Sequence, residues 1–159
     1  MVAPNSSSVF TSFDSAETPV GPPLIGALLR MPLELVRHRM LERLHEHGFD
    51  DLDAPHLNVL QYPGPQGARP SELAARLRIS KQALNYLLGQ LERLDYLERV
   101  RDAHDLRSRR IALTTRGHEA IRVIRDAVAE VEADWAEQLG ADRFAQLRAL
   151  LLELSESRQ

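Results

Sequence analysis

Residues 70–117 read PSELAARLRISKQALNYLLGQLERLDYLERVRDAHDLRSRRIALTTRG and contain the most informative pattern of the chain. We expect a short helix over residues 70–77, a break over 78–80, and a second amphipathic helix from Lys81 to about Leu94. Two short strands, 97–101 and 109–114, follow and are joined by a charged loop. Helix, turn, helix and hairpin in this order predict a winged helix-turn-helix, a unit that can place its second helix in the major groove of DNA.

The second helix of this unit has two different faces. Its apolar stripe consists of Leu84, Leu87, Leu88, Leu91 and Leu94, which we expect to be buried. On the opposite face, the amides of Gln82 and Asn85 can pair with adenine, and the hydroxyl of Tyr86 can reach a phosphate. Lys81 suits a phosphate, and Ser80 stands at the N-cap. An isolated helix with such a face would more simply be a solvated one, but the preceding helix and the following hairpin favour a DNA contact.

The hairpin predicts a second, basic contact. Arg107, Arg109 and Arg110 crowd the loop and the returning strand. A guanidinium on a thin loop can enter the minor groove, where the negative potential is enhanced in narrow tracts. Asp105 is expected to pair with Arg107 and to fix the shape of the loop, because a carboxylate pointed at DNA would be repelled by the phosphates.

The charge of the chain is unevenly distributed. The net charge is −3, which by itself is unusual for a DNA-binding protein. Residues 69–110, however, carry ten basic and six acidic side chains, a net charge of +4, whereas the segments on both sides are acidic. A positive middle between acidic flanks is a local electrostatic footprint for a polyanion. A basic face without a ligand is the alternative interpretation.

Long apolar helices are expected at both ends of the chain and predict a dimerisation arm. The segment from 24 to about 47 is helical in pattern, with Pro32 marking a kink or a new helix start. After residue 114, apolar side chains recur from Ile121 to Leu139 at steps close to a heptad. Because so apolar a strip cannot bury itself in a small domain, we expect a homodimer; an intramolecular bundle is the alternative. The candidate interface residues are Leu28, Ile124, Val128, Trp135, Leu147 and Leu151.

The stretch from Ser80 to Arg99 resembles the recognition helix of the MarR family of bacterial transcriptional regulators. The pattern Asp102-x-x-Asp105-x-Arg107, followed by Ile111-Ala-Leu-Thr114-x-x-Gly117, is similar to the wing of that family and the entry to its long helix. The resemblance covers roughly residues 24–157. It implies a homodimer on a near-palindromic operator, usually a repressor, with DNA contacts at Ser80, Lys81, Gln82, Asn85, Tyr86 and Arg107. It also implies release by a small-molecule effector, such as an aromatic acid, in the cleft between arm and DNA lobe.

Composition and missing motifs exclude several other classes. The chain has no cysteine, which excludes disulfides and thiolate zinc sites. No apolar run approaches the roughly 18 residues that a membrane span needs, and no secretory signal is visible, so a cytoplasmic protein is expected. The six histidines lack a fixed ligand spacing, and we expect neither a metal nor a cofactor. No phosphate-binding loop, zinc-protease motif or nucleophile elbow occurs, so the protein is not expected to be an enzyme.

These observations predict a mainly helical (α+β) protein with three parts. Residues 1–23 form a flexible arm, residues 51–114 form the winged helix-turn-helix, and residues 24–50 with 115–159 form the dimerisation region. The expected partners are double-stranded DNA, a second copy of the chain and a possible small-molecule effector, with no membrane. The alternative function is a winged-helix module that uses the same face to bind another protein.

Overall fold

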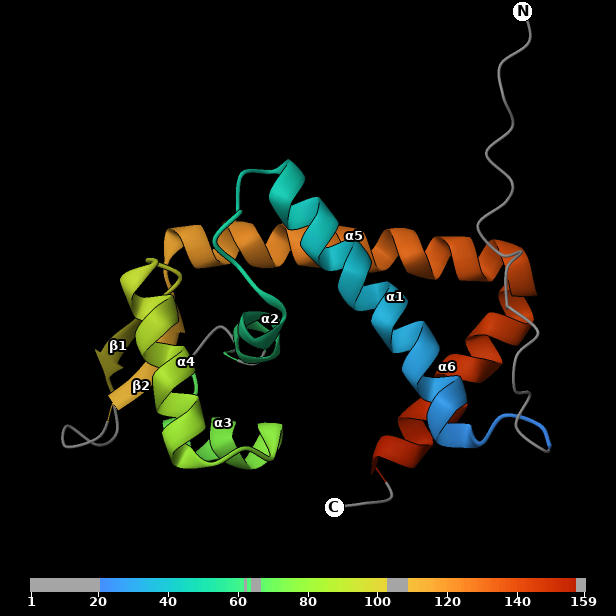
Figure 1. Cartoon of the computed structure of the whole chain (residues 1–159), viewed down its shortest axis with the longest axis horizontal. Coiled ribbons are helices and arrows are strands. Elements are labelled where there is room, and N and C mark those ends of the chain that lie inside the picture. The colour runs from blue at the N-terminus through green and yellow to red at the C-terminus, as the bar shows by residue number, and fades with distance from the viewer. Residues whose placement is uncertain (1–20, 62, 64–66, 103–108, 157–159) are drawn as a thin grey trace, which may run out of the picture.

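The computed structural model describes residues 21–61, 63, 67–102 and 109–156 (Figure 1). The elements in chain order are α1 (Ile25–Glu46), α2 (Ala54–Leu60), α3 (Pro70–Leu77), α4 (Lys81–Arg93), β1 (Leu97–Arg101), β2 (Arg109–Leu113), α5 (Thr115–Leu139) and α6 (Ala141–Glu156). In Figure 1, α2, α3, α4 and the hairpin form a lobe at one end of α5, and α6 folds back from its other end. The predicted fold class, mainly helical with a two-stranded wing, is confirmed.

The first helix is continuous through Pro32. The sequence predicts either a kink or a new start there, and the structure has a single helix, α1, with this proline inside it. Proline leaves the carbonyl four residues earlier, that of Leu28, without its helical donor. Residues 28–35 are all exposed, so water can satisfy this group. The helix therefore needs no second cap at this point.

The core lies where α1 crosses α5 and where the lobe meets both helices. Met40 and Leu44 of α1 join the same buried cluster as Ile124 and Ala127 of α5. The lobe adds its own apolar stripe, in which Leu84, Leu88 and Leu91 of α4 are at most 1% exposed. Full burial of each such side chain favours folding by about 1.5–3 kcal/mol. The back of α4 is thereby fixed against the rest of the lobe.

The helix starts follow the side chains that the sequence offers as caps. Oγ of Ser80 accepts a 3.1 Å hydrogen bond from the backbone N–H of Ala83, at the start of α4. Oγ1 of Thr114 accepts a 3.0 Å bond from the N–H of Gly117, at the start of α5. These bonds satisfy N–H groups that the first turn of a helix leaves without partners. The cap at Ser80 agrees with the prediction from sequence, whereas Thr114 caps α5 instead of ending the second strand.

The glycine of the entry to α5 is required by a close approach of backbone. A Cβ atom on Gly117 would lie 2.1 Å from the carbonyl oxygen of Tyr96. This carbonyl also accepts a 3.1 Å hydrogen bond from the N–H of Thr114. The connection between α4 and β1 therefore touches the start of α5 through main chain, and no other residue fits at position 117.

The wing is a short antiparallel hairpin. Leu97 pairs with Leu113 and Arg101 with Arg109, and Ala68 adds an isolated bridge to Ile111. Ile111 is fully buried, as the alternation of the strand predicts. The second strand ends at Leu113, one residue earlier than predicted, because Thr114 serves as the cap of α5.

The apolar strip of α5 is partly covered by its own chain, which differs from the expectation that a partner is needed for all of it. Ile121, Ile124 and Val131 are at most 9% exposed, because α1 and the lobe pack on them. Trp135 contacts Phe144 of α6, with ring centroids 6.4 Å apart. Ile124 therefore belongs to the core of the single chain and offers almost no surface to a second copy.

Two further properties of the described residues concern membrane-spanning helices and clusters of metal-binding side chains. Among these residues, no helix is long and apolar enough to cross a membrane. Within the same residues, no group of three histidine or carboxylate side chains is placed to hold a metal ion.

Candidate nucleic-acid interface

The outer face of α4 carries the five polar residues that the sequence nominates. Their side chains are all exposed and lie along the cap and the first two turns of the helix: Ser80, Lys81, Gln82, Asn85 and Tyr86. Because the opposite side of α4 is buried, this face cannot turn inward. The structure thus brings these side chains together on one solvent-facing surface with a rigid support behind it.

The turn before α4 contains a backbone conformation that is unusual for its residue. Arg78 caps the end of α3 with φ +52°, in the left-handed region that favours glycine. Its N–H donates to the carbonyl of Ala75, and the N–H of Ile79 donates to that of Ala74. These bonds close α3 in the manner of a Schellman end. The turn therefore sets the angle between α3 and α4 although no glycine is present.

Three residues of the wing were expected to contact DNA or to shape the loop, namely Asp105, Arg107 and Arg109, and the structure describes Arg109. Arg109 is exposed at the start of β2, where it pairs across the hairpin with Arg101. Asp105 and Arg107 lie outside the described residues. The strand positions next to the loop are therefore basic on both sides of the hairpin.

A buried carboxylate at the base of the wing was missed by the sequence reasoning. Asp102 is 1% exposed, and its Oδ2 accepts bonds of 3.0 and 2.9 Å from Nε and Nη2 of Arg69. Nη1 of Arg110 lies 3.5 Å from the same oxygen, and Nη2 of Arg110 donates to the carbonyl of Gly67 at 2.7 Å. Arg110 thus faces the lobe interior and not the outer surface of the wing. The available signal in the sequence was the position of Asp102 directly after Arg101, at the end of the predicted first strand.

This cluster joins the wing to the helix-turn-helix. Arg69 is the N-cap residue of α3, Asp102 follows β1, and Arg110 lies in β2. A buried carboxylate is stable only when it is paired and hydrogen-bonded. The cluster therefore fixes the base of the hairpin relative to the start of α3, a relationship on which any joint binding by α4 and the wing depends.

A second network joins the lobe to α5. The hydroxyl of Tyr96 donates to Oδ1 of Asp51, and Nη2 of Arg116 donates to Oδ2 at 2.9 Å. The guanidinium of Arg116 also lies over the Tyr96 ring, 4.6 Å from its centroid, and donates to the carbonyl of Leu94. Burial, together with the bond to Asp51, raises the pKa of Tyr96 well above its usual range. The phenol therefore stays neutral and serves as a donor.

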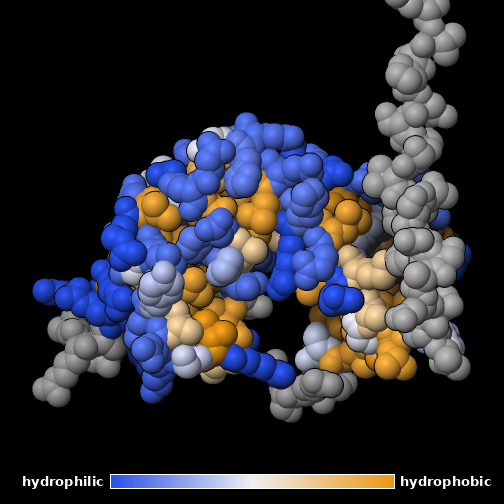
Figure 2. Space-filling view, viewed as in Figure 1, coloured by the Kyte–Doolittle hydropathy of each residue, from blue (hydrophilic) through white to orange (hydrophobic). Residues whose placement is uncertain are grey.

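The residues nominated for a dimer interface do not share one environment. Leu28, Leu147 and Leu151 are 40–48% exposed, whereas Val128 and Trp135 are half-buried within the chain. Figure 2 shows hydrophobic side chains gathered over α6 and the adjacent end of α1. No residue of α6 is buried in the single chain. The open apolar surface lies on these two helices and not on the N-terminal half of α5.

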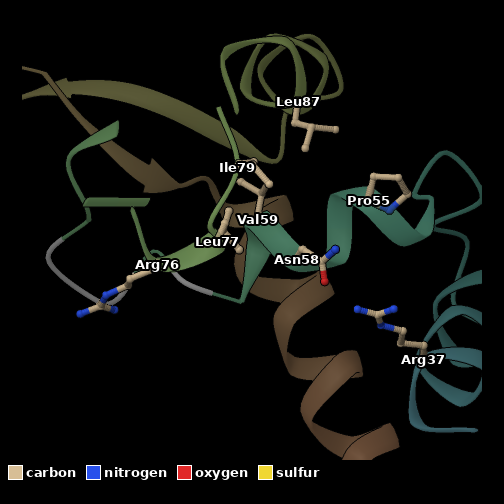
Figure 3. A pocket seen from close by; sticks show the side chains of 8 residues that line it. All are labelled: Arg37, Pro55, Asn58, Val59, Arg76, Leu77, Ile79 and Leu87. Carbon is tan, nitrogen blue, oxygen red and sulfur yellow. The ribbon is translucent and has the colours of Figure 1, made fainter. Parts of the chain in front are cut away.

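A cavity lies between α1 and the lobe. Its volume is about 380 Å³, and it is lined by Arg37, Pro55, Asn58, Val59, Arg76, Leu77, Ile79 and Leu87. Figure 3 shows Arg37 extending from α1 toward Asn58 on α2, whereas Arg76 points away from the apolar side chains. Arg37 also lies 3.7 Å from Glu34 on its own helix. The cavity thus combines apolar walls with a cationic group on one side.

Comparison with known proteins gives a family match over the lobe and a fold match over most of the chain. A family model described as "MarR family" matches residues 47–108. The S. aureus MepR–DNA complex is 24% identical, with 86% of this chain and 99% of that chain covered and a TM-score of 0.66. S. aureus MepR bound to ethidium bromide is 25% identical, with 86% and 98% covered and a TM-score of 0.58. Apo MarR from E. coli is 24% identical, with 84% and 98% covered and a TM-score of 0.65. No curated protein matches the sequence.

Proposed function

We propose that this chain, which matches the MarR family over residues 47–108, is a DNA-binding transcriptional regulator of that family and acts as a homodimeric repressor on a near-palindromic operator. The observation that carries the proposal is the exposed polar face of α4, which the buried side chains of Leu84, Leu88 and Leu91 hold outward. The action is non-catalytic, and it takes place on cytoplasmic DNA. Two copies of α4, about one helical turn of DNA apart, would read the two half-sites.

The side chains of α4 divide into two roles in this proposal. Gln82 and Asn85 read base edges, because an amide can donate to and accept from adenine at once. Ser80 and Lys81 contact the phosphate backbone and fix the register of the helix in the groove, and Tyr86 offers its hydroxyl to an acceptor on the DNA. Support comes from the solved complex of MepR with DNA, whose fold this chain shares. The wing adds Arg109, with Arg107 in the loop, toward the minor groove.

The second copy would cover the apolar surface of α1 and α6. Seven large apolar side chains from Leu24 to Leu35 and five from Leu147 to Leu154 are exposed, and no other part of the chain that the structure describes covers them. So large a patch is unusual for a monomer and marks an interaction surface. Its place at the ends of the two outer helices would leave both α4 faces free for DNA.

An effector would bind in the cavity between α1 and the lobe. The apolar walls and Arg37 suit a small molecule with an aromatic or aliphatic body and an anionic group. Because the cavity joins two parts of the chain, a ligand there could change the distance between the two copies of α4. A coupling of about 1–3 kcal/mol is sufficient for release of DNA. A small molecule is also bound in the solved MepR–ethidium structure.

The decisive experiment measures binding of the purified protein to its own promoter region and to a scrambled duplex at several salt concentrations. We expect tight, selective binding as a dimer that weakens steeply with salt, because phosphate contacts release counterions. The variant Asn85→Ala should lose about 1–3 kcal/mol on the operator and relax the base preference. Gln138→Ala, at an exposed site near the far end of α5, is the matched control. Weak binding that is equal on both duplexes would favour the alternative, a winged-helix module that binds protein.

A further inference from the structure

A chain of hydrogen bonds leads from the start of α2 to the outer face of α4. The backbone N–H of Asp53 donates to Nδ1 of His56 at 3.0 Å. Nε2 of His56 lies 3.4 Å from Oε1 of Gln90, and Nε2 of Gln90 lies 3.3 Å from the hydroxyl oxygen of Tyr86. His56 is 4% exposed and Tyr86 is 66% exposed, so this series of hydrogen bonds runs from the interior to the surface.

The donor and acceptor of every hydrogen bond in this series follow from the first bond, in which the backbone N–H of Asp53 donates. A backbone amide can only donate, so Nδ1 of His56 has to accept and carries no hydrogen. In a neutral imidazole the hydrogen is then on Nε2, which donates to the next residue. That residue, Gln90, therefore has to present its oxygen to His56.

The same argument fixes the side-chain amide of Gln90. With its oxygen toward His56, its NH₂ group points to Tyr86 and donates to the hydroxyl oxygen. The reversed amide would place two donors against each other at His56, which costs a buried hydrogen bond. The Tyr86 oxygen thus accepts from within the protein, and its own hydrogen is directed to solvent.

We propose that Gln90 and His56 are positioning residues that hold Tyr86 as a hydrogen-bond donor toward an acceptor atom of DNA. The proposal rests on the DNA binding proposed above and assigns a polarity to one contact within it. Every phosphate oxygen is an acceptor, and the major-groove edges of guanine, adenine and thymine also offer acceptors. A hydroxyl already directed outward needs no reorientation when the DNA arrives, so less is lost on binding.

The tautomer of His56 tests the direction of the chain in the free protein, without DNA. Nitrogen-15 NMR of the imidazoles distinguishes the nitrogen that carries hydrogen from the one that does not, and the loss of one set of signals in His56→Leu assigns the residue. Hydrogen on Nε2 and none on Nδ1 is the expected result. Hydrogen on Nδ1 would reverse the direction of these hydrogen bonds and overturn the proposal, whatever the protein binds.

A double-mutant cycle on the operator tests the consequence for binding. Tyr86→Phe removes the donor and should raise Kd by about 10-fold to 100-fold, the range for a bond to a charged acceptor. Gln90→Met keeps the length of the side chain, removes the bond to Tyr86, and should raise Kd by about 3-fold to 10-fold. The decisive result is that Gln90→Met has no further effect in a protein that already carries Tyr86→Phe. Equal effects of Gln90→Met in both backgrounds would overturn the proposal.

The variant Gln90→Glu adds a second test to the double-mutant cycle, because it reverses the hydrogen bond between residue 90 and Tyr86. A carboxylate only accepts, so Tyr86 would donate inward and present lone pairs to the DNA. The added negative charge also repels DNA. The loss of affinity due to this charge persists in a protein that carries Tyr86→Phe, and it is measured in that background. We expect the loss beyond the charge effect to depend on the tyrosine hydroxyl. Thermal unfolding of each variant confirms that it is folded before its Kd is used.

The outcomes separate this proposal from the proposed function. If the wild-type protein binds no duplex selectively, the proposed function fails and the DNA contact of Tyr86 fails with it. If the wild type binds its operator but the cycle shows no coupling, only the positioning role is wrong. A loss for Tyr86→Phe that is equal on operator and scrambled duplex identifies a phosphate as the acceptor, whereas a loss confined to the operator identifies a base; both support the proposed donor.

Discussion

The hydroxyl of Tyr96 donates a 2.5 Å hydrogen bond to Oδ1 of Asp51, although 45 positions separate the two residues. Asp51 lies in the connection between α1 and α2, and Tyr96 lies between α4 and β1. Arg116, in the first turn of α5, holds the other carboxylate oxygen. Three segments that meet at the joint between lobe and long helix are therefore tied through one carboxylate.

Loss of the Tyr96 hydroxyl is expected to weaken this joint. Tyr96→Phe should lower the free energy of unfolding by about 1–2 kcal/mol, the cost of losing one partly buried hydrogen bond. The effect is limited because Arg116 still pairs with Asp51. Chemical denaturation of both proteins at neutral pH measures it. Tyr86→Phe removes an exposed hydroxyl and serves as the control, with a change in stability below about 0.5 kcal/mol.

The same hydroxyl should make stability depend on alkaline pH. Burial raises the pKa of Tyr96 in the folded state, whereas the unfolded chain has a phenol pKa of about 10. Above that pH the unfolded state loses the proton first, so the stabilisation present at lower pH is progressively lost as pH rises. Denaturation from pH 8 to about 10.5 should show a steeper decline for the wild type than for Tyr96→Phe. Parallel curves would mean that Tyr96 does not titrate differently on folding.

The left-handed residue at the end of α3 is expected to cost stability. Arg78→Gly should raise the free energy of unfolding by about 0.5–1 kcal/mol, because glycine adopts φ +52° without a steric penalty. Arg78→Ala keeps the penalty and removes the charge, so it should show no such gain. A similar gain in both variants would assign the effect to charge repulsion in the basic lobe. Thermal melting points of the three proteins give the comparison.

Gly117 is expected to tolerate no side chain. In Gly117→Ala the new methyl group would meet the carbonyl oxygen of Tyr96 at 2.1 Å, so the connection between α4 and β1 would have to move away from the start of α5. We expect a loss of more than about 2 kcal/mol, as for other overpacked sites. Gly26→Ala is the matched control, because nothing lies within 4 Å of its position in α1. That variant should be unchanged or stabilised by up to about 1 kcal/mol.

The open apolar surface of α6 should decide the oligomeric state. Leu151→Glu places a charge where a second copy is expected, and it should convert a dimer into a monomer in sedimentation velocity at micromolar concentration. Gln146→Glu, also exposed on α6, adds the same charge outside the leucine positions and should leave the dimer intact. A dimer that persists with Leu151→Glu would place the interface elsewhere.

Sequence patterns predict this fold well where local chemistry decides it. Ser80 and Thr114 cap the helices that they precede, and the stripe of Leu84, Leu88 and Leu91 is buried as its spacing predicts. Both strands were placed to within one residue. These features depend on neighbours three or four positions apart, or on alternation within one strand, and such relationships are visible in sequence.

The candidate site is predictable in part for the same reason. Exposure of Asn85 and Tyr86 follows from the helical wheel of α4. The inward pairing of Arg110 with Asp102 and the partial burial of the α5 strip do not follow from any local pattern. They depend on which segments pack against one another, and a wheel cannot distinguish a strip covered by its own chain from one that awaits a partner.

The order of elements, the cap at Ser80, the buried face of α4 and the family resemblance can all be predicted from the amino-acid sequence, because each depends on side chains that are close together along the chain. The contacts that join these elements depend on the three-dimensional fold. The carboxylates of Asp51 and Asp102 and the imidazole of His56 each bond residues about 30 positions away or more. Such bonds form because burial leaves a polar group no water, so its partner is whichever donor or acceptor the folded chain brings within reach.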